Sequence, residues 1–560
     1  MFTTIMRLLT SGDLLTTVLS FSILITLIVL IIIYSKVKNN DKILKLWKIL
    51  CLIPLAISII HFVIFTAGTA FLHILPHYLP IYIPSVLIAL LPLLIKKKVL
   101  YKISSTLIIV VCLAFVVLSL SPNKIANYTR KSLSNSYISL CDYLEDNYVL
   151  SQWKKADYQK LKNDGLVLVK QAEETGDINK YYEALNNLVN SFHDGHMSLA
   201  FYNTDYNYNI EKIKEFNDYG LSLTTLDDGN TIAINVEKDL DIKDGDVVVK
   251  WDNIPVKEAI NKVVLPTSEG PLENEIIQKT FYLAGVGGDT VNVIYLNSNG
   301  EEKTTTLKKL NSELPRALKS LGVLNRSRDE EYTYKMLSDN IGYLRISCEE
   351  TSGLSDVWAY LTGDHSVARE MFRKDLRTLK EQGMTKLVID IRNNGGGYEE
   401  VSPARASLFT KEEMYAFSLG VKNGNELKSV EDRYVIADGE FSDLEIVTLT
   451  NMRCASAGDG MALYLSRLDN VTVAGLTNPS GINQETGGYV YLPENALICF
   501  PVGLILDKDG NPNIDIDDTR KSRNPVDIKI PLNKENALKI FNGEDYELEW
   551  AIDYLNKKSS

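Results

Sequence analysis

The first 122 residues of the chain are almost continuously apolar. Long hydrophobic runs cover residues 14–34, 49–72, 79–95 and 103–122. A helix needs about 20 apolar residues to cross the hydrocarbon core of a membrane, and every run except the shorter third one reaches that length. A cleaved signal peptide would explain only the first run. The pattern therefore predicts a multi-pass α-helical membrane anchor over residues 1–122, with about four transmembrane helices.

Basic residues set the expected orientation of this anchor. They gather in two loops, after the first and the third run: Lys36, Lys38, Lys42, Lys45, Lys48, Lys96, Lys97, Lys98 and Lys102. The loop between the second and third runs has neither lysine nor arginine. Because cytoplasmic loops are enriched in these residues, we expect both basic loops inside. This predicts a protein of the cell membrane, in contact with membrane lipid, whose residues after 122 are extracytoplasmic.

Beyond residue 122 the periodicity changes twice. Over residues 123–200 apolar side chains recur at helical spacing, as in Leu140, Tyr143 and Leu144, which predicts a helical cap. Over residues 207–312 short alternating or β-branched segments are separated by turns that contain glycine. This second pattern predicts a small β-barrel with one or two helices.

Residues 330–560 alternate strand-like and helix-like segments. The runs KLVIDI at 386–391 and EIVTLT at 445–450 are apolar over most of their length, as is typical of strands buried on both faces. Helical patterns occupy 354–383 and 461–468. A sheet layered with helices, and hence an α/β domain, is the architecture that buries both kinds of element.

Composition excludes some functions. The formal net charge of −12 argues against a nucleic-acid-binding protein, since such proteins carry basic surfaces. The six cysteines have neither CxxC nor zinc-ligand spacing. We therefore expect buried thiols, with no disulfide framework and no metal site.

Two of the predicted buried strands run into sequences suited to acyl transfer. KLVIDI is followed by RNNGGG, whose glycines expose backbone N–H groups that can bind an oxyanion. EIVTLT is followed by NMRCASAGDG, which puts Ser456 at a strand-to-helix turn similar to the nucleophile elbow of other hydrolases. Taken alone, a serine in such a turn is more simply interpreted as a helix cap. A serine nucleophile also needs a base, and the histidines beyond residue 122 are His193, His196 and His365.

Together these motifs resemble the S41 serine peptidases, which are the C-terminal (tail-specific) processing peptidases and their tricorn-like relatives. The strings FHDGHMSL, IGYLRI, LVIDIRNNGGG, LTNMRCASAGDGMALYL, VAGLTNPSGINQETGG and NPVDIKIPL occur in that family's order. The resemblance implies a ClpP/crotonase-like α/β peptidase core over residues 330–560. It also implies a PDZ-like identity for the β-barrel insert at 207–312.

The resemblance carries over to individual residues. It implies that Ser456 is the nucleophile and that His196, in the DGH motif, is the general base. The oxyanion hole would combine the N–H of Ala457 with the N–H of Gly395 or Gly396. No metal or cofactor is needed for this chemistry.

One feature departs from the tail-specific branch, which uses a Ser–Lys dyad. No lysine occurs between Ser456 and Lys508, and the region of the family's lysine reads NPSGINQ. The resemblance therefore favours a Ser–His mechanism. Gln484 matches a glutamine that closes this turn and is a candidate orienting residue. The orienting acid stays open among four residues: Asp515, Asp517, Asp518 and Asp527. Of these, Asp527 matches the family's PDI element.

The sequence thus predicts a membrane-anchored serine endopeptidase that acts on polypeptides. Its PDZ-like domain offers a way to recognise a substrate by its C-terminus, through strand addition, although an insert that binds nothing is the alternative. A second hypothesis is a catalytically inactive pseudopeptidase that serves as an extracytoplasmic peptide-binding module. A third, a transport or signalling protein, is weakened because the apolar runs carry almost no charge.

Overall fold

The computed structural model describes residues 41–63, 78, 82–90, 124–267, 270–312, 314–324, 332–350, 365–423 and 426–558. The predicted transmembrane runs at 14–34 and 103–122 lie outside the described residues. Helix α3 (Asp41–His61) is the one described helix that is long and apolar enough to cross a membrane, over Leu44–His61. The other spans of the multi-pass anchor therefore stay predictions.

Helix α3 begins earlier than the sequence suggested. Lys42, Lys45 and Lys48, which we placed in a cytoplasmic loop, belong to the first turns of the helix. Lysine is a good helix former, so the helix runs through the basic segment. Residues 82–90, within the third apolar run, are also helical. The two helices are joined by a hydrogen bond of 2.8 Å between the hydroxyls of Ser58 and Ser85.

The predicted helical cap consists of three helices, α6 (Leu133–Asn147), α7 (Tyr158–Thr175) and α8 (Ile178–Asn190). Ser132, Asp157 and Asp177 cap their N-termini through side-chain oxygens, as short polar residues do at helix starts. The cap shares a sheet with the C-terminal half of the chain. The strand order of that sheet is β1-β16-β17-β2. Its strands are β1 (Lys124–Asn127), β2 (Ser198–Phe201), β16 (Thr486–Tyr491) and β17 (Ala496–Pro501).

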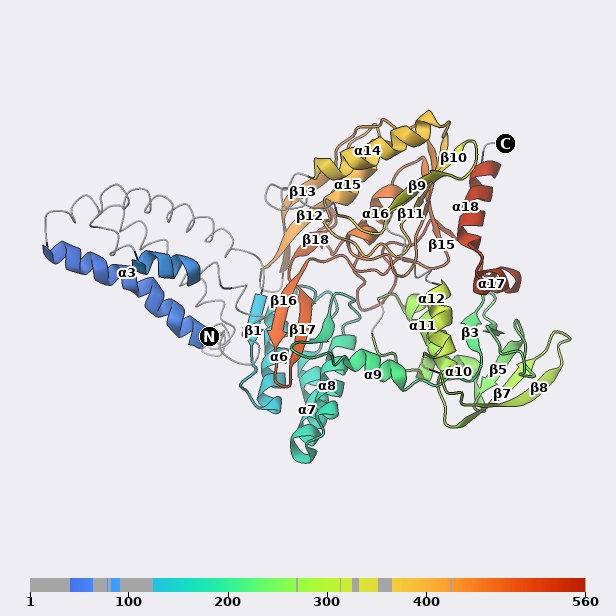
Figure 1. The fold of residues 1–560 in the computed structure, drawn as a ribbon, viewed down its shortest axis with the longest axis horizontal. Helices are drawn as coiled ribbons and strands as arrows, with labels where there is room; N and C mark the ends of the chain where they lie inside the picture. The colour runs from blue at the N-terminus through green and yellow to red at the C-terminus, as the bar shows by residue number, and fades with distance from the viewer. Residues whose placement is uncertain are drawn as a thin grey trace.

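The region predicted to be PDZ-like, at 207–312 and called the PDZ-like region below, is an open sheet in the described residues. Its strand order is β3-β4-β5-β7-β8, and the short β6 (Ile254–Pro255) is paired to β5. We predicted a barrel, but β3 and β8 form two separate ends of this path. The strands of this path are β3 (Ser222–Thr225), β4 (Thr231–Ile234), β5 (Val247–Trp251), β7 (Thr290–Leu296) and β8 (Glu302–Lys308). The helices around it are α9 (Tyr208–Lys214), α10 (Val256–Lys262), α11 (Leu272–Leu283) and α12 (Arg316–Leu324). Figure 1 shows this region on the side of the molecule opposite to α3.

The side chains of the end strand β3 are buried. Ser222, Leu223 and Thr224 are at most 2% exposed, and helix α12 packs against both β3 and α11. At the start of α12, the Arg316 guanidinium donates to the carbonyl of Asn235 at 2.9 Å. Residues Thr224 and Thr225 of β3 and residues of α11 line a pocket in this part of the molecule.

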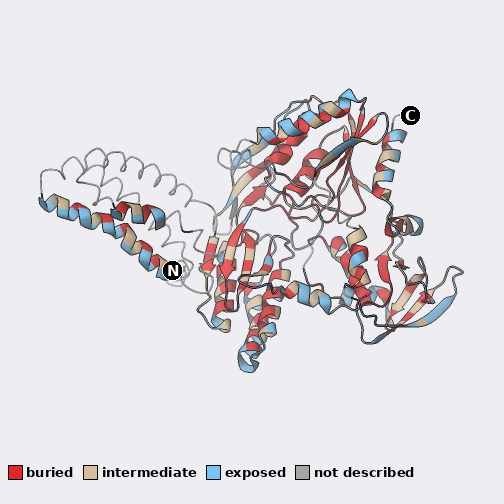
Figure 2. Ribbon diagram, viewed as in Figure 1, coloured by how far each residue is buried: buried red, intermediate tan, exposed pale blue. Residues whose placement is uncertain are grey.

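The peptidase core is built on a six-stranded sheet in the order β19-β15-β14-β11-β10-β9. All neighbours are parallel except β9 and β10. The strands are β9 (Thr333–Met336), β10 (Ile341–Arg345), β11 (Lys386–Asp390), β14 (Glu445–Leu449), β15 (Val471–Gly475) and β19 (Ile528–Lys529). Figure 2 shows that this sheet is largely buried. This burial explains why the sequences of β11 and β14 are mostly apolar.

Helices surround this sheet, as the α/β prediction requires. They are α14 (Ser366–Glu381), α15 (Val401–Ala406), α16 (Ala457–Ser466), α17 (Lys534–Phe541) and α18 (Tyr546–Lys557), with the short 3-10 helix η2 (Ser407–Phe409). A three-stranded sheet completes the core, in the order β13-β12-β18. Its strands are β12 (Met414–Asn423), β13 (Glu426–Val435) and β18 (Leu504–Leu506).

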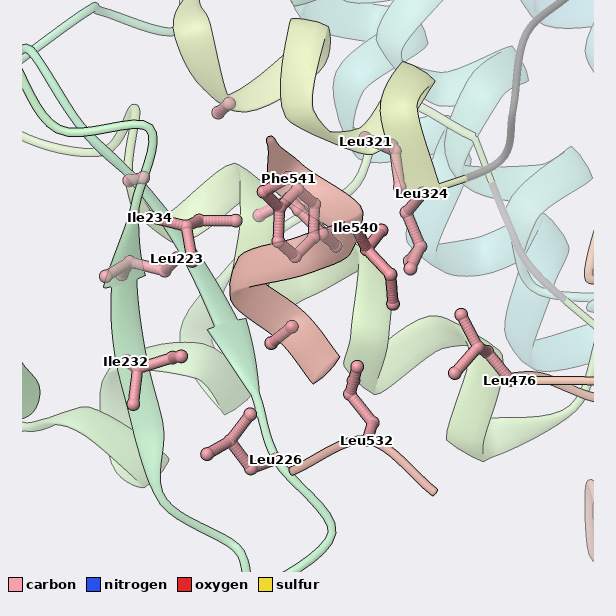
Figure 3. Close-up of a cluster of buried hydrophobic side chains, with 14 of the residues drawn as sticks. Leu223, Leu226, Ile232, Ile234, Leu321, Leu324, Leu476, Leu532, Ile540 and Phe541 are labelled. Carbon is pink, nitrogen blue, oxygen red and sulfur yellow. The ribbon is translucent and has the colours of Figure 1, made fainter. Parts of the chain in front are cut away.

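A hydrophobic cluster joins the PDZ-like region to the peptidase core. Figure 3 shows side chains from β3, β4, α12 and α17 pointing toward one another: Leu223, Ile234, Leu321, Leu324, Ile540 and Phe541. Burying such side chains contributes about 1.5–3 kcal/mol each. The PDZ-like region and the peptidase core therefore share one core in this structure.

Candidate active site

Ser456 lies where the central sheet ends. Strands β11 and β14 are parallel neighbours with Asp390 paired to Leu449, so the segments that follow them emerge at the same edge of the sheet. The glycine segment follows β11 and the Ser456 turn follows β14. The juxtaposition that the sequence predicted for these two motifs is therefore present.

The backbone of Ser456 is strained. It precedes α16 with φ of 56° and ψ of −133°, and its side chain makes no capping hydrogen bond. A non-glycine residue in such a conformation costs about 1–3 kcal/mol and is found mainly at functional sites. The strain and the missing capping hydrogen bond favour the nucleophile interpretation over the helix-cap interpretation.

Neighbouring segments hold this turn in place. The Ser456 N–H donates to the Ile482 carbonyl at 2.9 Å, and the Ser456 carbonyl accepts from the Gly460 N–H at 3.0 Å. The Ala455 N–H donates to the Asn394 carbonyl at 2.9 Å. The conformation of the turn is thus determined by the glycine segment on one side and by the segment around Ile482 on the other.

Gly396 approaches the turn so closely that only glycine fits. A Cβ on Gly396 would lie 2.5 Å from the Cβ of Ser456 and 2.9 Å from the nitrogen of Ala457, and its φ is +93°. The N–H of Gly396 donates to Asn394 Oδ1 at 3.0 Å, and that of Gly395 to the Ser347 carbonyl at 3.3 Å. Both glycine N–H groups are therefore engaged within the protein. For the N–H of Ala457, no acceptor is found among the described residues.

A buried ion pair supports the glycine segment. The Asn394 amide donates to Glu349 Oε1 at 2.7 Å, and Arg405 donates to Glu349 Oε2 at 2.6 Å. Burial raises the pKa of Glu349, and Arg405 opposes this shift. The sequence analysis missed this pair, because the two residues lie 56 positions apart.

His196 lies in the turn before β2. Its backbone N–H donates to Asp194 Oδ1 at 2.9 Å, and its Nδ1 is buried with no hydrogen-bond partner in the described part of the chain. Burial lowers the pKa of the imidazole, and the charge of Asp194 opposes this. A neutral imidazole with a free nitrogen is the form that a general base requires.

The His196 turn and the Ser456 turn meet at Ile482. A Cβ on Gly195 would lie 2.7 Å from Ile482 Cδ1, and the Ile482 carbonyl accepts the Ser456 N–H. No hydrogen bond between the side chains of Ser456 and His196 is found among the described residues. Catalytic hydrogen bonds often tighten only when substrate binds.

The other two histidines have different surroundings. His193 Nδ1 lies 3.9 Å from Glu275 Oε2 on helix α11, and burial, with the charge of Arg520, lowers its pKa to about 4. His365 precedes α14, where its ring packs 5.3 Å from the ring of Tyr398. Neither one is brought to the Ser456 turn by a contact in the described residues.

Of the four candidate acids, Asp515 is the one that contacts the segment next to Ile482, which carries Asn483 and Gln484. Its Oδ2 accepts from the Gln484 amide at 2.6 Å and from the Asn483 N–H at 3.1 Å. Its Oδ1 is buried with no partner among the described residues. Burial, together with the charge of Asp194, raises the pKa of Asp515 to about 7. Lys154, in the turn between α6 and α7, opposes this shift and donates to the His193 carbonyl at 3.2 Å.

The remaining candidates have local roles. Gln484 also donates to the Ile505 carbonyl at 3.2 Å, so it fixes Asp515 to strand β18. Asp527 accepts the Val473 N–H at 2.8 Å beside β15, and Asp517 accepts from Thr519. Asp518 pairs with Lys155 at 2.8 Å.

Comparison with known proteins supports the peptidase interpretation. Residues 340–519 match the family described as Peptidase family S41, and no curated protein matches the chain. Mature CPAF in complex with lactacystin is similar in structure, with 13% identity and a TM-score of 0.50 over 76% of this chain and 97% of that one. A CPAF mutant gives 12% identity and a TM-score of 0.51 over 76% and 98%. At these identities the likeness shows the fold alone. The chain thus contains a Peptidase family S41 domain, and it is a serine-type peptidase.

Proposed function

We propose that this protein is a membrane-anchored serine endopeptidase that cleaves polypeptides through an acyl-enzyme, with Ser456 as nucleophile and His196 as general base. The observation that carries the proposal is the strained turn at Ser456, whose side chain makes no capping hydrogen bond and against which Gly396 packs. Strain of this kind persists only where the surrounding structure enforces it.

The proposed reaction follows from the groups at the site. Neutral His196 takes the proton of the Ser456 hydroxyl, and the oxygen attacks the peptide carbonyl. His196 then gives this proton to the leaving amine, and water releases the acyl group. Asp194 beside His196, and Asp515 in its ionised form, provide the negative charge that stabilises the transient imidazolium.

The oxyanion would be bound by backbone N–H groups. Ala457 supplies the first, at the N-terminus of α16, where the helix dipole also favours negative charge. Gly396 supplies the second in this proposal, with Gly395 as the alternative. Because the Gly396 N–H donates to Asn394 Oδ1, it must turn away from this amide when substrate binds.

Anchoring in the membrane is the next part of the proposal. Helix α3 is a candidate span, and the apolar runs of the sequence add further ones, which gives a multi-pass protein in contact with membrane lipid. The basic loops favour an extracytoplasmic peptidase domain. Protease treatment of intact cells tests this orientation. The peptidase domain should be degraded if it faces outside. A peptidase domain that stays intact while the cells remain sealed would contradict the orientation.

The proposed substrate is a polypeptide whose primary recognition is at the site around Ser456. Recognition of its C-terminus by the PDZ-like region, through a peptide added to the edge of β3, is a further part of the proposal. Two observations support it: β3 lies at the end of its sheet, and Thr224 and Thr225 line a pocket together with residues of α11.

The pseudopeptidase stays as the second candidate, and one observation favours it. Both glycine N–H groups are engaged within the protein, so the oxyanion hole is incomplete as it stands. The test is cleavage of an unfolded polypeptide such as casein by the full-length protein in detergent, beside Ser456→Ala and His196→Ala. Cleavage that both substitutions abolish supports the proposal. Cleavage by wild type that survives Ser456→Ala refutes the nucleophile, and no cleavage by wild type favours the pseudopeptidase.

A further inference from the structure

The segment 481–484 controls the position of the nucleophile. It lies where the sequence lacks the lysine of the Ser–Lys branch, and its Ile482 carbonyl accepts the Ser456 N–H at 2.9 Å. Just before it, the Ser480 N–H donates to the carbonyl of Cys454 at 2.9 Å. A displacement of this segment would therefore be passed directly to the strained turn.

Buried carboxyl groups hold this segment from several sides. Asp459 Oδ2 accepts the Gly481 N–H at 2.7 Å, and Asp515 accepts the Asn483 N–H. Glu399 Oε1 accepts from the Asn483 side-chain amide at 3.2 Å. Glu399 comes directly after the glycine segment and the residue Tyr398, so it connects that segment with 481–484.

The surroundings of Glu399 favour the protonated, uncharged form of its carboxyl group. Its Oε1 also accepts from the Tyr464 hydroxyl on α16, whereas its Oε2 is buried with no partner in the described residues. No described lysine, arginine or histidine forms an ion pair with it. The other charged groups that face it are the carboxyls of Glu400 and Glu349. Because an unpaired buried charge is costly, the acid keeps its proton, and burial raises its pKa to about 8.

The first turn of α16 makes room for this group. A Cβ on Gly460 would lie 2.5 Å from Glu399 Oε1, and the Gly460 N–H donates to the Ser456 carbonyl. The carboxyl of Glu399 thus packs against the same helical turn that begins at the nucleophile. Through Asn483 it contacts the segment on the other side of that nucleophile.

We propose that Glu399, as a neutral carboxylic acid, is a positioning residue that fixes segment 481–484 and the first turn of α16 and thereby aligns Ser456 for attack. This inference rests on the proposed function, because it takes Ser456 as the nucleophile. Glu399 acts through Asn483 and α16 and does not touch the substrate.

The proposal predicts different effects for three variants of the full-length protein. Glu399→Gln keeps an uncharged group of the same shape, so its kcat should stay within about threefold of wild type. Glu399→Ala should lower kcat about 100-fold, because a misplacement of the nucleophile by about 1 Å costs about that much in rate. Its KM should stay within about twofold of wild type, because substrate binding is not affected. Glu400→Gln is the matched control at neutral pH, because no hydrogen bond joins this neighbouring carboxyl to segment 481–484 in the described residues, and its kcat there should be that of wild type. Because the charge of Glu400 raises the pKa of Glu399, this control is not used for the pH profile.

The pH profile separates positioning from general stabilisation. Wild type should lose kcat above about pH 8, where Glu399 ionises, and Glu399→Gln should keep its rate through that range. A Glu399→Ala enzyme with wild-type kcat would overturn the proposal. So would an alkaline decrease of the same size in wild type and in Glu399→Gln.

Hydrogen exchange tests the inference even if the proposed activity fails. Glu399→Ala should accelerate amide exchange in peptides that cover 454–460 and 478–484, while Glu399→Gln and Glu400→Gln should leave it at the wild-type rate. Unchanged exchange in folded Glu399→Ala refutes the positioning role. An inactive wild type that shows the expected exchange pattern refutes only the proposed function.

Discussion

Replacing Gly396 by alanine tests how closely the glycine segment and the nucleophile turn are packed. The new Cβ would lie 2.5 Å from the Cβ of Ser456, whereas ordinary contact begins at 3.4 Å. The two segments must therefore separate by nearly 1 Å, because backbone surrounds the site and cannot rotate away. The φ of +93° adds about 1–3 kcal/mol of backbone strain for alanine.

These quantities give a numerical expectation. A displacement of about 1 Å at a reacting atom costs on the order of 100-fold in rate, which corresponds to about 2.7 kcal/mol of activation free energy. We expect Gly396→Ala to lower kcat by at least this factor and to reduce the free energy of unfolding by about 1–3 kcal/mol. Peptide cleavage kinetics and urea denaturation of the detergent-solubilised protein measure the two effects.

Gly395→Ala provides the matched comparison within the same segment. An added Cβ there meets nothing within 4 Å and the residue is not in the left-handed region, so its backbone N–H is kept without steric cost. We expect kcat within about threefold of wild type, well below the loss estimated for a 1 Å displacement. Equal losses in both variants, or wild-type activity in Gly396→Ala, would refute the geometry described for this site.

Three further predictions concern the groups around the site. Asp515→Asn should lower kcat about 100-fold or more in cleavage assays, since it removes charge that stabilises the imidazolium; an unchanged kcat would exclude Asp515 from the mechanism. Because burial lowers the pKa of His196 below 6.5, the imidazole is neutral at pH 6.5, so the acid limb of kcat/KM should have its midpoint below that value; a midpoint above 6.5 would contradict the assignment. The same shift implies that folding loses stability as pH falls below 6.5. Arg405→Ala leaves Glu349 buried without its cation and should lower the free energy of unfolding by about 3–5 kcal/mol; a loss under 1 kcal/mol in urea denaturation would show that the pair contributes little.

The sequence was informative where a pattern is local. Strands β11 and β14 could be predicted because strands buried on both faces read as apolar runs, and the turn at Ser456 follows from small residues after such a run. Parallel pairing of these two strands then brings the glycine segment to Ser456. This part of the site is contained in short motifs, so it can be read without knowing the rest of the fold.

The sequence was uninformative where the structure depends on pairing between distant residues. Nothing local shows that β1 pairs with β16, or that the Glu399 carboxyl lies against Gly460. Asp515 could not be chosen among neighbouring acids, because its surroundings include the hydrogen bond from Gln484 and the charge of the cap residue Lys154, both distant in sequence. The basic segment before the second apolar run was assigned to a loop, although lysine is as compatible with a helix as with a loop.

The central claim is that Ser456 is an activated nucleophile, and labelling with a fluorophosphonate probe tests it most directly. The full-length protein in detergent would be treated with the probe, digested and analysed by mass spectrometry to locate the modified residue. The account predicts modification at Ser456, abolished in Ser456→Ala and slowed at least 100-fold in His196→Ala, as expected when a general base is lost. A folded wild-type protein with no label at Ser456, or with its label on another serine, would contradict the account.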